Sequence, residues 1–401
     1  MTQEAVTTPK MMLNEFAWDE RYRIRDTADV MTPALVIYPE VVALNIERTL
    51  TLIDGNPDRW RAHIKTSKLN YSLRMLVQRG VRNFKCATTL ELLMACRSGA
   101  QDILVAYPMM GANARRVQEV VTEFPRVRIS VLAENDEQIM QWCGSRIGIF
   151  LDVNPGMNRT GIESSQGEKI AVLARKIEST GLEFRGLHYY DGQFGAIPAT
   201  ERNEATRAGY DRLLQVVSEI EASGTHVPEV ITAGTPTFPC SLAYTEFRNK
   251  KFTHRISPGT IVYNDATSLA QLSTAYGYRP AALVVTRVVS RPRTGIITCD
   301  AGHKAVSADA GLPTCIVIGH KDLAPLSPSE EHLPMAVEGG ADGPPCGEVL
   351  YLLPRHVCPT VNNFDCALVT RNGEIESVEK VSARGREAPL LREVEQTISA
   401  R

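Results

Sequence analysis

Short apolar runs alternate with segments of helical periodicity through the middle of the chain. Eight runs of four to seven residues have the length and composition of β-strands: 62–65, 83–87, 102–107, 128–132, 147–153, 184–190, 229–233 and 253–256. Between most of them, apolar residues recur three or four positions apart, as in helices with one buried face; examples are 89–97, 114–124, 168–179 and 201–222. Strands alternating with helices predict an α/β fold, and eight such units predict a (β/α)8 TIM-type barrel. An open doubly wound sheet is the alternative, but no GxGxxG motif follows the first strand.

The pattern changes on both sides of this region. A strand at 32–38 and a helix at 41–53 precede the eight runs, and we assign both to a barrel domain at 31–268. Beyond it, strand-like runs separated by turn-rich segments predict an appended, mostly antiparallel β domain at 269–401. Residues 1–30 are polar with scattered aromatic side chains, and we expect an N-terminal arm that packs on the β domain.

Composition and charge narrow the kind of partner. The 401 residues carry a net charge of −2 with acids and bases interleaved, which argues against nucleic acid or an anionic membrane surface as the main partner. No apolar run approaches the length of a membrane span, and residues 1–15 lack the order of a signal peptide. Nine cysteines without paired spacing fit a reducing compartment. We therefore expect a cytoplasmic protein that acts on a small molecule.

A lysine stands where the first predicted barrel strand breaks into a turn, within the stretch 61–68 (RAHIKTSK). Active sites of such barrels lie at the C-terminal ends of the strands, so Lys65 is placed on the catalytic face. A partly desolvated lysine there can lose its proton and form a Schiff base with a carbonyl cofactor. Taken alone, a solvated charge at a strand end is the commoner interpretation. We treat Lys65, with His63 in the same strand, as catalytic candidates.

Two loops with small residues follow the last two predicted strands. Gly234 and Thr235 lie after the seventh strand, and Gly259 and Thr260 lie after the eighth. Such loops leave backbone N–H groups and hydroxyls free for a phosphate, and barrels of this kind often bind phosphate between these two loops. A simple turn is the alternative for each loop, but their positions reinforce each other and predict a phosphate site.

Two further strand ends carry polar side chains. The loop 152–161 presents Arg159, whose fork of donors could hold a phenolate or carboxylate; the alternative is a solvated arginine in a surface turn. Strand alternation places His188 and Tyr190 on one face, where a pair of core aromatics is the alternative. Both positions fall on the face expected to carry the site.

The β domain contains a candidate metal motif at 354–360 (PRHVCPT). In an extended segment His356 and Cys358 would point to the same side, and imidazole with thiolate suits zinc. Two protein ligands would leave open coordination positions, as a catalytic metal requires. The alternative is a buried cysteine beside a polar histidine.

Together these stretches resemble the fold-type III pyridoxal-phosphate enzymes, the alanine racemase-like barrel group. Within it they look like the D-threonine aldolase and D-serine dehydratase branch, over residues 32 to about 369. The resemblance rests on several motifs in the same order: 32–35 (TPAL), 61–66 (RAHIKT), 300–307 (DAGHKAVS), 329–332 (SEEH) and 356–362 (HVCPTVN). The chain departs from the branch at Ser67, where many relatives carry a histidine.

The resemblance implies roles for individual residues. Lys65 would form the Schiff base with pyridoxal phosphate, and Arg159 matches the arginine near the cofactor ring. Tyr190 matches the tyrosine whose hydroxyl reaches the cofactor phosphate, and Tyr263 would lie near that phosphate. The two loops that carry Gly234-Thr235 and Gly259-Thr260 would hold the phosphate. His356, also a catalytic candidate, and Cys358 would hold a divalent metal beside the β-hydroxyl of the substrate, with zinc favoured over manganese or magnesium because of the thiolate.

The resemblance implies a lyase that acts on D-3-hydroxy amino acids and assembles as a homodimer. The resemblance favours aldolase-type cleavage to glycine and an aldehyde. Dehydratase-type elimination to a 2-oxo acid and ammonia is the alternative, because the thiolate of Cys358 is more similar to the dehydratases. A racemase and a non-catalytic pyridoxal-phosphate carrier are further alternatives, and the metal motif with its second domain argues against both.

Overall fold

The computed structural model describes residues 18–248 and 250–391. Eight parallel strands form a nearly closed barrel in the order β10-β9-β8-β6-β5-β4-β3-β2. Their bounds are β2 (Arg61–His63), β3 (Asn83–Cys86), β4 (Asp102–Val105), β5 (Arg128–Ala133), β6 (Gly148–Asn154), β8 (Glu183–Tyr189), β9 (Glu229–Thr232) and β10 (Thr253–Ile256). A bridge between Trp60 and Ile256 brings the two outer strands together. All eight predicted barrel strands are confirmed, and β2 ends two residues before Lys65.

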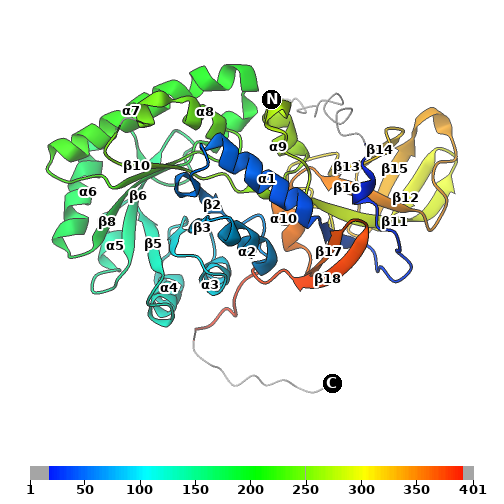
Figure 1. Ribbon diagram of the computed structural model, residues 1–401, viewed down its shortest axis with the longest axis horizontal. Coiled ribbons are helices and arrows are strands. Elements are labelled where there is room, and N and C mark those ends of the chain that lie inside the picture. Colours follow the sequence, from blue (N-terminus) through cyan, green and yellow to red (C-terminus); the bar gives the residue numbers. More distant parts are fainter. Residues whose placement is uncertain (1–17, 249, 392–401) are drawn as a thin grey trace.

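Helices surround the barrel, and most of them lie in the connections between its strands (Figure 1). They are α1 (Pro39–Leu52), α2 (Asn70–Gln78), α3 (Thr89–Arg97), α4 (Gly111–Glu123), α5 (Asp136–Met140), α6 (Gly167–Ser179), α7 (Ala199–Ala222), α8 (Phe238–Ala243) and α9 (Ala266–Gln271). A short strand, β7 (Ile162–Glu163), pairs with β6 beyond the barrel. Among the described residues, no helix is both long enough and apolar enough to cross a membrane.

Side chains fill the inside of the barrel in layers. At its N-terminal end, Arg61 pairs with Asp102 and Glu229, each at 2.8 Å, and Arg185 pairs with Asp102 at 2.6 Å. Above this charged layer lies an apolar layer: Leu104, Leu132, Phe150 and Ile231. The apolar layer separates the structural ion pairs from the C-terminal mouth, where the candidate residues gather.

The second sheet is mostly antiparallel, with the order β14-β15-β12-β11-β1-β17-β18, and β16 pairs with both β11 and β13. Its strands are β1 (Ala34–Ile37), β11 (Ala282–Arg293), β12 (Ile296–Cys299), β13 (Cys315–Val317), β14 (Leu323–Pro325), β15 (Leu333–Val337), β16 (Val349–Pro354), β17 (Cys366–Arg371) and β18 (Glu374–Lys380). Figure 1 shows this β domain beside the barrel. The predicted fold class, a barrel with an appended β domain, is confirmed.

One assignment needs correction, because β1 is not part of the barrel. It pairs antiparallel with β11 and parallel with β17, so residues 34–37 belong to the β domain although we placed them with the barrel. An apolar run predicts a strand buried on both faces but does not identify its partners. In the described part of the arm, Tyr22 donates to the carbonyl of Pro280, and the Ile24 N–H donates to the Tyr351 hydroxyl. Residues 1–17 of the predicted arm lie outside the described residues.

Candidate active site

Lys65 stands in the turn after β2, half-buried at the C-terminal mouth of the barrel. His63, the last residue of β2, has its Nδ1 atom 3.0 Å from the carbonyl oxygen of Lys85 on the neighbouring strand. Burial, with the charges of Lys85 and Lys65, lowers the pKa of His63 well below its ordinary value. The imidazole of His63 is therefore neutral at neutral pH and carries no charge into the site.

A second lysine, which the sequence analysis missed, reaches the same mouth. Lys85 lies inside β3, is 2% exposed, and has its Nζ atom 3.4 Å from Nε2 of His188. His188 in turn has Nδ1 2.7 Å from a carboxylate oxygen of Asp152. Lys85 faces the mouth because parallel neighbours in register face the same side, and Lys85 is in register with His63.

Tyr190 lies at the centre of the predicted cofactor-binding residues. The guanidinium carbon of Arg159 stands 4.9 Å from the centre of the Tyr190 ring, and Nζ of Lys85 stands 5.7 Å from it. A Cβ atom added to Gly234 would come within 2.6 Å of the same ring. The loop after β9 therefore packs directly on Tyr190, and the structure brings Arg159, Tyr190 and Gly234 together as the sequence analysis expected.

The loop after β10 packs against the end of β2. A Cβ atom added to Gly259 would lie 2.2 Å from the carbonyl oxygen of His63, so the close approach requires glycine. In the part of the chain that the structure describes, the backbone N–H groups of Thr235, Gly259 and Thr260 donate no hydrogen bond. These free donors beside a half-buried lysine fit pyridoxal phosphate, which presents a phosphate and an aldehyde.

Tyr263 contacts the segment that follows Lys65. Its side chain is fully buried, and its hydroxyl lies 2.7 Å from the hydroxyl of Ser72 and 3.4 Å from the carbonyl oxygen of Ser67. These contacts hold the segment that follows Lys65. A direct contact between Tyr263 and the cofactor stays a prediction.

The metal motif of the β domain has a different local structure from the one we expected. His356 caps the short helix α10 (Val357–Asn362), and Cys358 lies in its first turn, so the segment is not extended. The side chains of His356 and Cys358 still interact. Burial alone would lower the pKa of His356, but its hydrogen bond with Cys358, and then the one with Asp309, raises this pKa to about 9. The correction arises because the pattern HxC does not distinguish an extended segment from a helix start.

Cys358 also contacts the barrel. Its Sγ atom lies 3.0 Å from the hydroxyl of Thr66, the residue that follows Lys65. Burial alone would raise the pKa of the Cys358 thiol, but the hydrogen bond with His356 and the charge of Lys65 lower it. The HxC pair of the β domain therefore lies next to the lysine of the barrel.

These donors fit a metal with open positions. Nδ1 of His356 lies 2.6 Å from a carboxylate oxygen of Asp309, an arrangement that orients a metal-binding imidazole and leaves Nε2 for the ion. A thiol with a lowered pKa supplies the second donor. Within the described ranges, no cluster of three or more histidine, cysteine, aspartate or glutamate side chains is arranged to hold a metal. Among the described residues His356 and Cys358 are the two candidate ligands, and other ligands would have to come from substrate or water.

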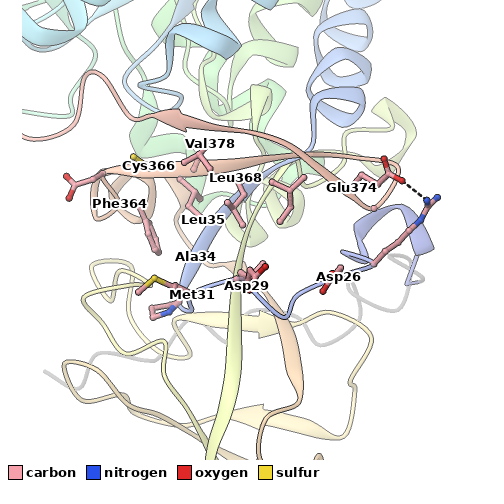
Figure 2. Close-up of a pocket in the computed structure, with 17 residues that line it drawn as sticks. Asp26, Asp29, Met31, Ala34, Leu35, Phe364, Cys366, Leu368, Glu374 and Val378 are labelled. Carbon is pink, nitrogen blue, oxygen red and sulfur yellow. Dashed lines mark hydrogen bonds and ion pairs between the residues drawn. The ribbon is translucent and has the colours of Figure 1, made fainter.

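A large groove on the surface lies elsewhere. It has a volume of about 930 Å³ and runs between the arm and the strands β1, β17 and β18. Figure 2 shows Leu35, Leu368 and Val378 along it, with Met31 on the arm side and Glu374 at one end. Glu374 forms an ion pair with Arg25. The groove is lined by none of the candidate site residues, so it does not extend the active site.

Comparison with known proteins decides the family. The model of the alanine racemase N-terminal domain matches residues 39–266, and that of the putative serine dehydratase domain matches residues 281–370. The chain belongs to the alanine racemase-like family. The first match covers more than half of the chain and coincides with the barrel, and the second coincides with strands of the β domain.

Relatives of this chain are named as lyases. D-threonine aldolase from Arthrobacter sp. is 27% identical over 368 residues, which cover 89% of this chain and 94% of the relative. D-threo-3-hydroxyaspartate dehydratase from Delftia sp. (strain HT23) is 22% identical over 378 residues, which cover 87% and 97%. The crystal structure of D-threonine aldolase from Filomicrobium marinum superposes with a TM-score of 0.79 at 23% identity, covering 89% of this chain and 96% of that one. The predicted class, a pyridoxal-phosphate-dependent lyase of fold type III, is confirmed.

Proposed function

We propose that the protein uses pyridoxal phosphate and a divalent metal to cleave D-3-hydroxy amino acids. One observation carries this proposal: Cys358 of the β domain touches Thr66, the residue after Lys65. A group that can bind an aldehyde covalently and a pair that can bind a metal are therefore neighbours. The names of the relatives, an aldolase and a dehydratase of 3-hydroxy amino acids, support the same substrate class.

The residues of the chain have separate tasks in this proposal. Bound pyridoxal phosphate would supply an acceptor for the electron pair released at Cα of the substrate. Lys65 would hold the cofactor covalently, while the loops of Gly234-Thr235 and Gly259-Thr260 bind its phosphate with their free N–H groups. His356 and Cys358 would hold a divalent metal, for which zinc suits the thiolate, and the metal would supply a Lewis acid for the β-hydroxyl.

We favour aldolase-type cleavage, in which the Cα–Cβ bond breaks to give glycine and an aldehyde. The match to D-threonine aldolase is the stronger of the two, at 27% against 22% identity. The second candidate is dehydratase-type elimination to a 2-oxo acid and ammonia. Cys358 favours this elimination, because a soft thiolate ligand at this position resembles the dehydratases.

Product analysis distinguishes the two reactions. The holoenzyme is incubated with D-threonine and with D-serine, in the presence of pyridoxal phosphate and either Zn²⁺ or Mn²⁺. Glycine and acetaldehyde from D-threonine would establish the aldolase. A 2-oxo acid and ammonia would establish the dehydratase instead. The proposal fails if neither these substrates nor acidic or bulkier D-3-hydroxy amino acids give either set of products.

We further propose that the protein is a homodimer in the cytoplasm. The dimer rests on the family resemblance, and the cytoplasmic location rests on the nine cysteines without paired spacing. Light scattering on the holoenzyme should give twice the chain mass of 44.2 kDa. A mass that stays at 44.2 kDa across micromolar concentrations would refute the dimer.

A further inference from the structure

Lys85 is a buried amine without an anionic partner. Its side chain is 2% exposed, and no carboxylate of the described residues lies within ion-pair distance of its Nζ atom. Buried lysines are normally paired, because an isolated buried charge is costly. Its polar contact is the 3.4 Å approach to Nε2 of His188. A lysine in such a place is either neutral or faces a ligand.

The partner of Lys85 is held in one orientation. Nδ1 of His188 lies 2.7 Å from the Asp152 carboxylate, so Nδ1 carries the ring proton and donates a hydrogen bond to that oxygen. The second carboxylate oxygen of Asp152 accepts a hydrogen bond from Thr160 at 2.8 Å, which fixes the carboxylate. Nε2 of His188 is therefore an acceptor, and Lys85 donates one N–H to it. When Lys85 is neutral, its lone pair points away from the histidine.

The surroundings of Lys85 disfavour its charged form. The charged and titratable groups that act on it come from three strands and the loops after them: Arg61, His63, Lys65, Asp152, Arg159, His188 and Asp191. Burial has the largest effect, Lys65 adds to it, and Asp152 opposes both, so the pKa of Lys85 falls to about 7. Catalytic acids and bases work best with a pKa near the working pH.

We propose that Lys85, oriented by His188 and Asp152, is a catalytic acid–base group that takes a proton from the bound substrate and returns it. This inference rests on the proposed function. In aldolase cleavage the hydroxyl loses a proton, the Cα–Cβ bond breaks, and Cα gains a proton. One amine that accepts and then returns a proton balances this reaction.

Unfolding of the holoenzyme tests the neutral amine without any measurement of activity. Lys85→Met removes the amine and keeps much of the side-chain volume. With the folded pKa near 7 and the unfolded value near 10.4, the unfolded wild type takes up a proton between these values and the folded protein does not. The urea midpoint of Lys85→Met should therefore rise relative to wild type as the pH falls from about 10 to about 7, and the difference should then level off. A constant difference across this range would refute a neutral Lys85.

The pH profile of kcat tests the proton transfer. Wild type should lose activity below a pH of about 7, where Lys85 becomes charged. Lys85→Arg keeps the charge but cannot act as a base, so kcat should fall by about 10²–10⁴-fold. Asp152→Asn removes the carboxylate that raises the pKa of Lys85, so the acid limb should move to lower pH. Lys321→Arg, at an exposed position, is the matched control.

The outcomes separate this inference from the proposed function. Near wild-type kcat in Lys85→Arg, or an acid limb unmoved in Asp152→Asn, would overturn the role of Lys85 while leaving the lyase intact. If no D-3-hydroxy amino acid is converted, the proposed function fails and the catalytic role of Lys85 fails with it. The unfolding data then still decide whether Lys85 is neutral.

Discussion

At the scale of single residues, three basic side chains and the buried carboxylate of Asp152 lie at the barrel mouth. Lys85 and Arg159 lie over the Tyr190 ring, and Lys65 stands in the turn after β2. Asp152 is engaged by His188 and Thr160. A surplus of basic groups suits a ligand with phosphate and carboxylate groups. The two lysines differ in position, since Lys65 stands in a turn and Lys85 inside a strand, and we propose different tasks for them.

Lys65→Ala should abolish covalent attachment of the cofactor. Without the amine no Schiff base forms, so borohydride should no longer fix a pyridoxyl group on the peptide that contains residue 65. We expect kcat to fall by roughly 10³-fold or more. Mass spectrometry of the borohydride-treated protein and the cofactor absorbance measure the effect. Lys321→Ala is the control; a pyridoxyl group retained by Lys65→Ala at another lysine would reject the assignment of Lys65.

The sequence was informative about Lys65 and silent about Lys85 for a physical reason. Lys65 follows a strand in a recognisable motif, and the position after a barrel strand is itself a functional signal. Lys85 lies in the middle of the apolar run 83–87, where alternation shows two faces but not which one lines the mouth. Only the register with His63 in β2 settles that question.

At the scale of elements, the loop after β10 is fixed to the end of β2. The N–H of His63 and the indole N–H of Trp60 both donate to the carbonyl of Pro258, at 3.5 and 3.0 Å. Gly259→Ala would bring Cβ to 2.2 Å from the backbone oxygen of His63, so the loop must move. We expect pyridoxal phosphate to bind at least tenfold more weakly, as measured by fluorescence titration.

Gly234→Ala is the matched comparison. Its Cβ would approach a ring carbon of Tyr190 at 2.6 Å, and a side-chain ring can tilt where a backbone oxygen cannot. The loss of cofactor affinity should therefore be smaller than in Gly259→Ala. Equal affinities of both variants and the wild type would show that the two loops do not hold the phosphate.

The charged layer at the opposite end of the barrel supports folding. Burial alone would raise the pKa of Asp102, but Arg61 and then Arg185 lower it far below the ordinary value. Asp102→Asn leaves these two guanidinium groups without that carboxylate, so the free energy of unfolding should fall by about 3–5 kcal/mol in urea titrations. Asp342→Asn, at an exposed ion pair with Arg291, should change it by less than about 0.5 kcal/mol.

The pH dependence of Asp102→Asn has a definite sign. Because the folded pKa of Asp102 is lowered, its stabilisation is complete above the unfolded value of about 4 and is lost as the pH falls below it. The difference in stability between wild type and Asp102→Asn should thus shrink in acid. A difference that is constant from pH 7 to pH 3 would contradict the ion-pair explanation.

Among the elements, the barrel strands were predictable and the partners of β1 were not. Eight apolar runs separated by helices allow few arrangements other than a barrel. The strand at 34–37 has the same apolar pattern, yet it pairs with β11 and β17, about 250 and 330 residues further along the chain. The HxC motif was found, but its helical start was not, since capping by His356 uses no side-chain hydrogen bond.

At the scale of the whole molecule, the site is divided between two domains. The barrel supplies Lys65 and the loops of Gly234 and Gly259, whereas the β domain supplies His356 and Cys358 on α10. The contact between Cys358 and Thr66 joins the two parts. In the proposed function the cofactor and the metal would depend on different elements, so the loading of one should be separable from the loading of the other.

His356→Ala and Cys358→Ala should each lose the metal and retain the cofactor. Each variant removes one of two protein ligands, so metal content measured by mass spectrometry should fall from one equivalent per chain to near zero, with turnover lost. Pyridoxal phosphate should stay bound through Lys65, with unchanged cofactor absorbance, and a chelator should have the same effect on wild type. Cys346→Ala and His332→Ala, at exposed positions, are the controls. If both site variants turn over substrate at the wild-type rate in chelator, the protein works without a metal, and the HxC pair serves only the contact between the domains.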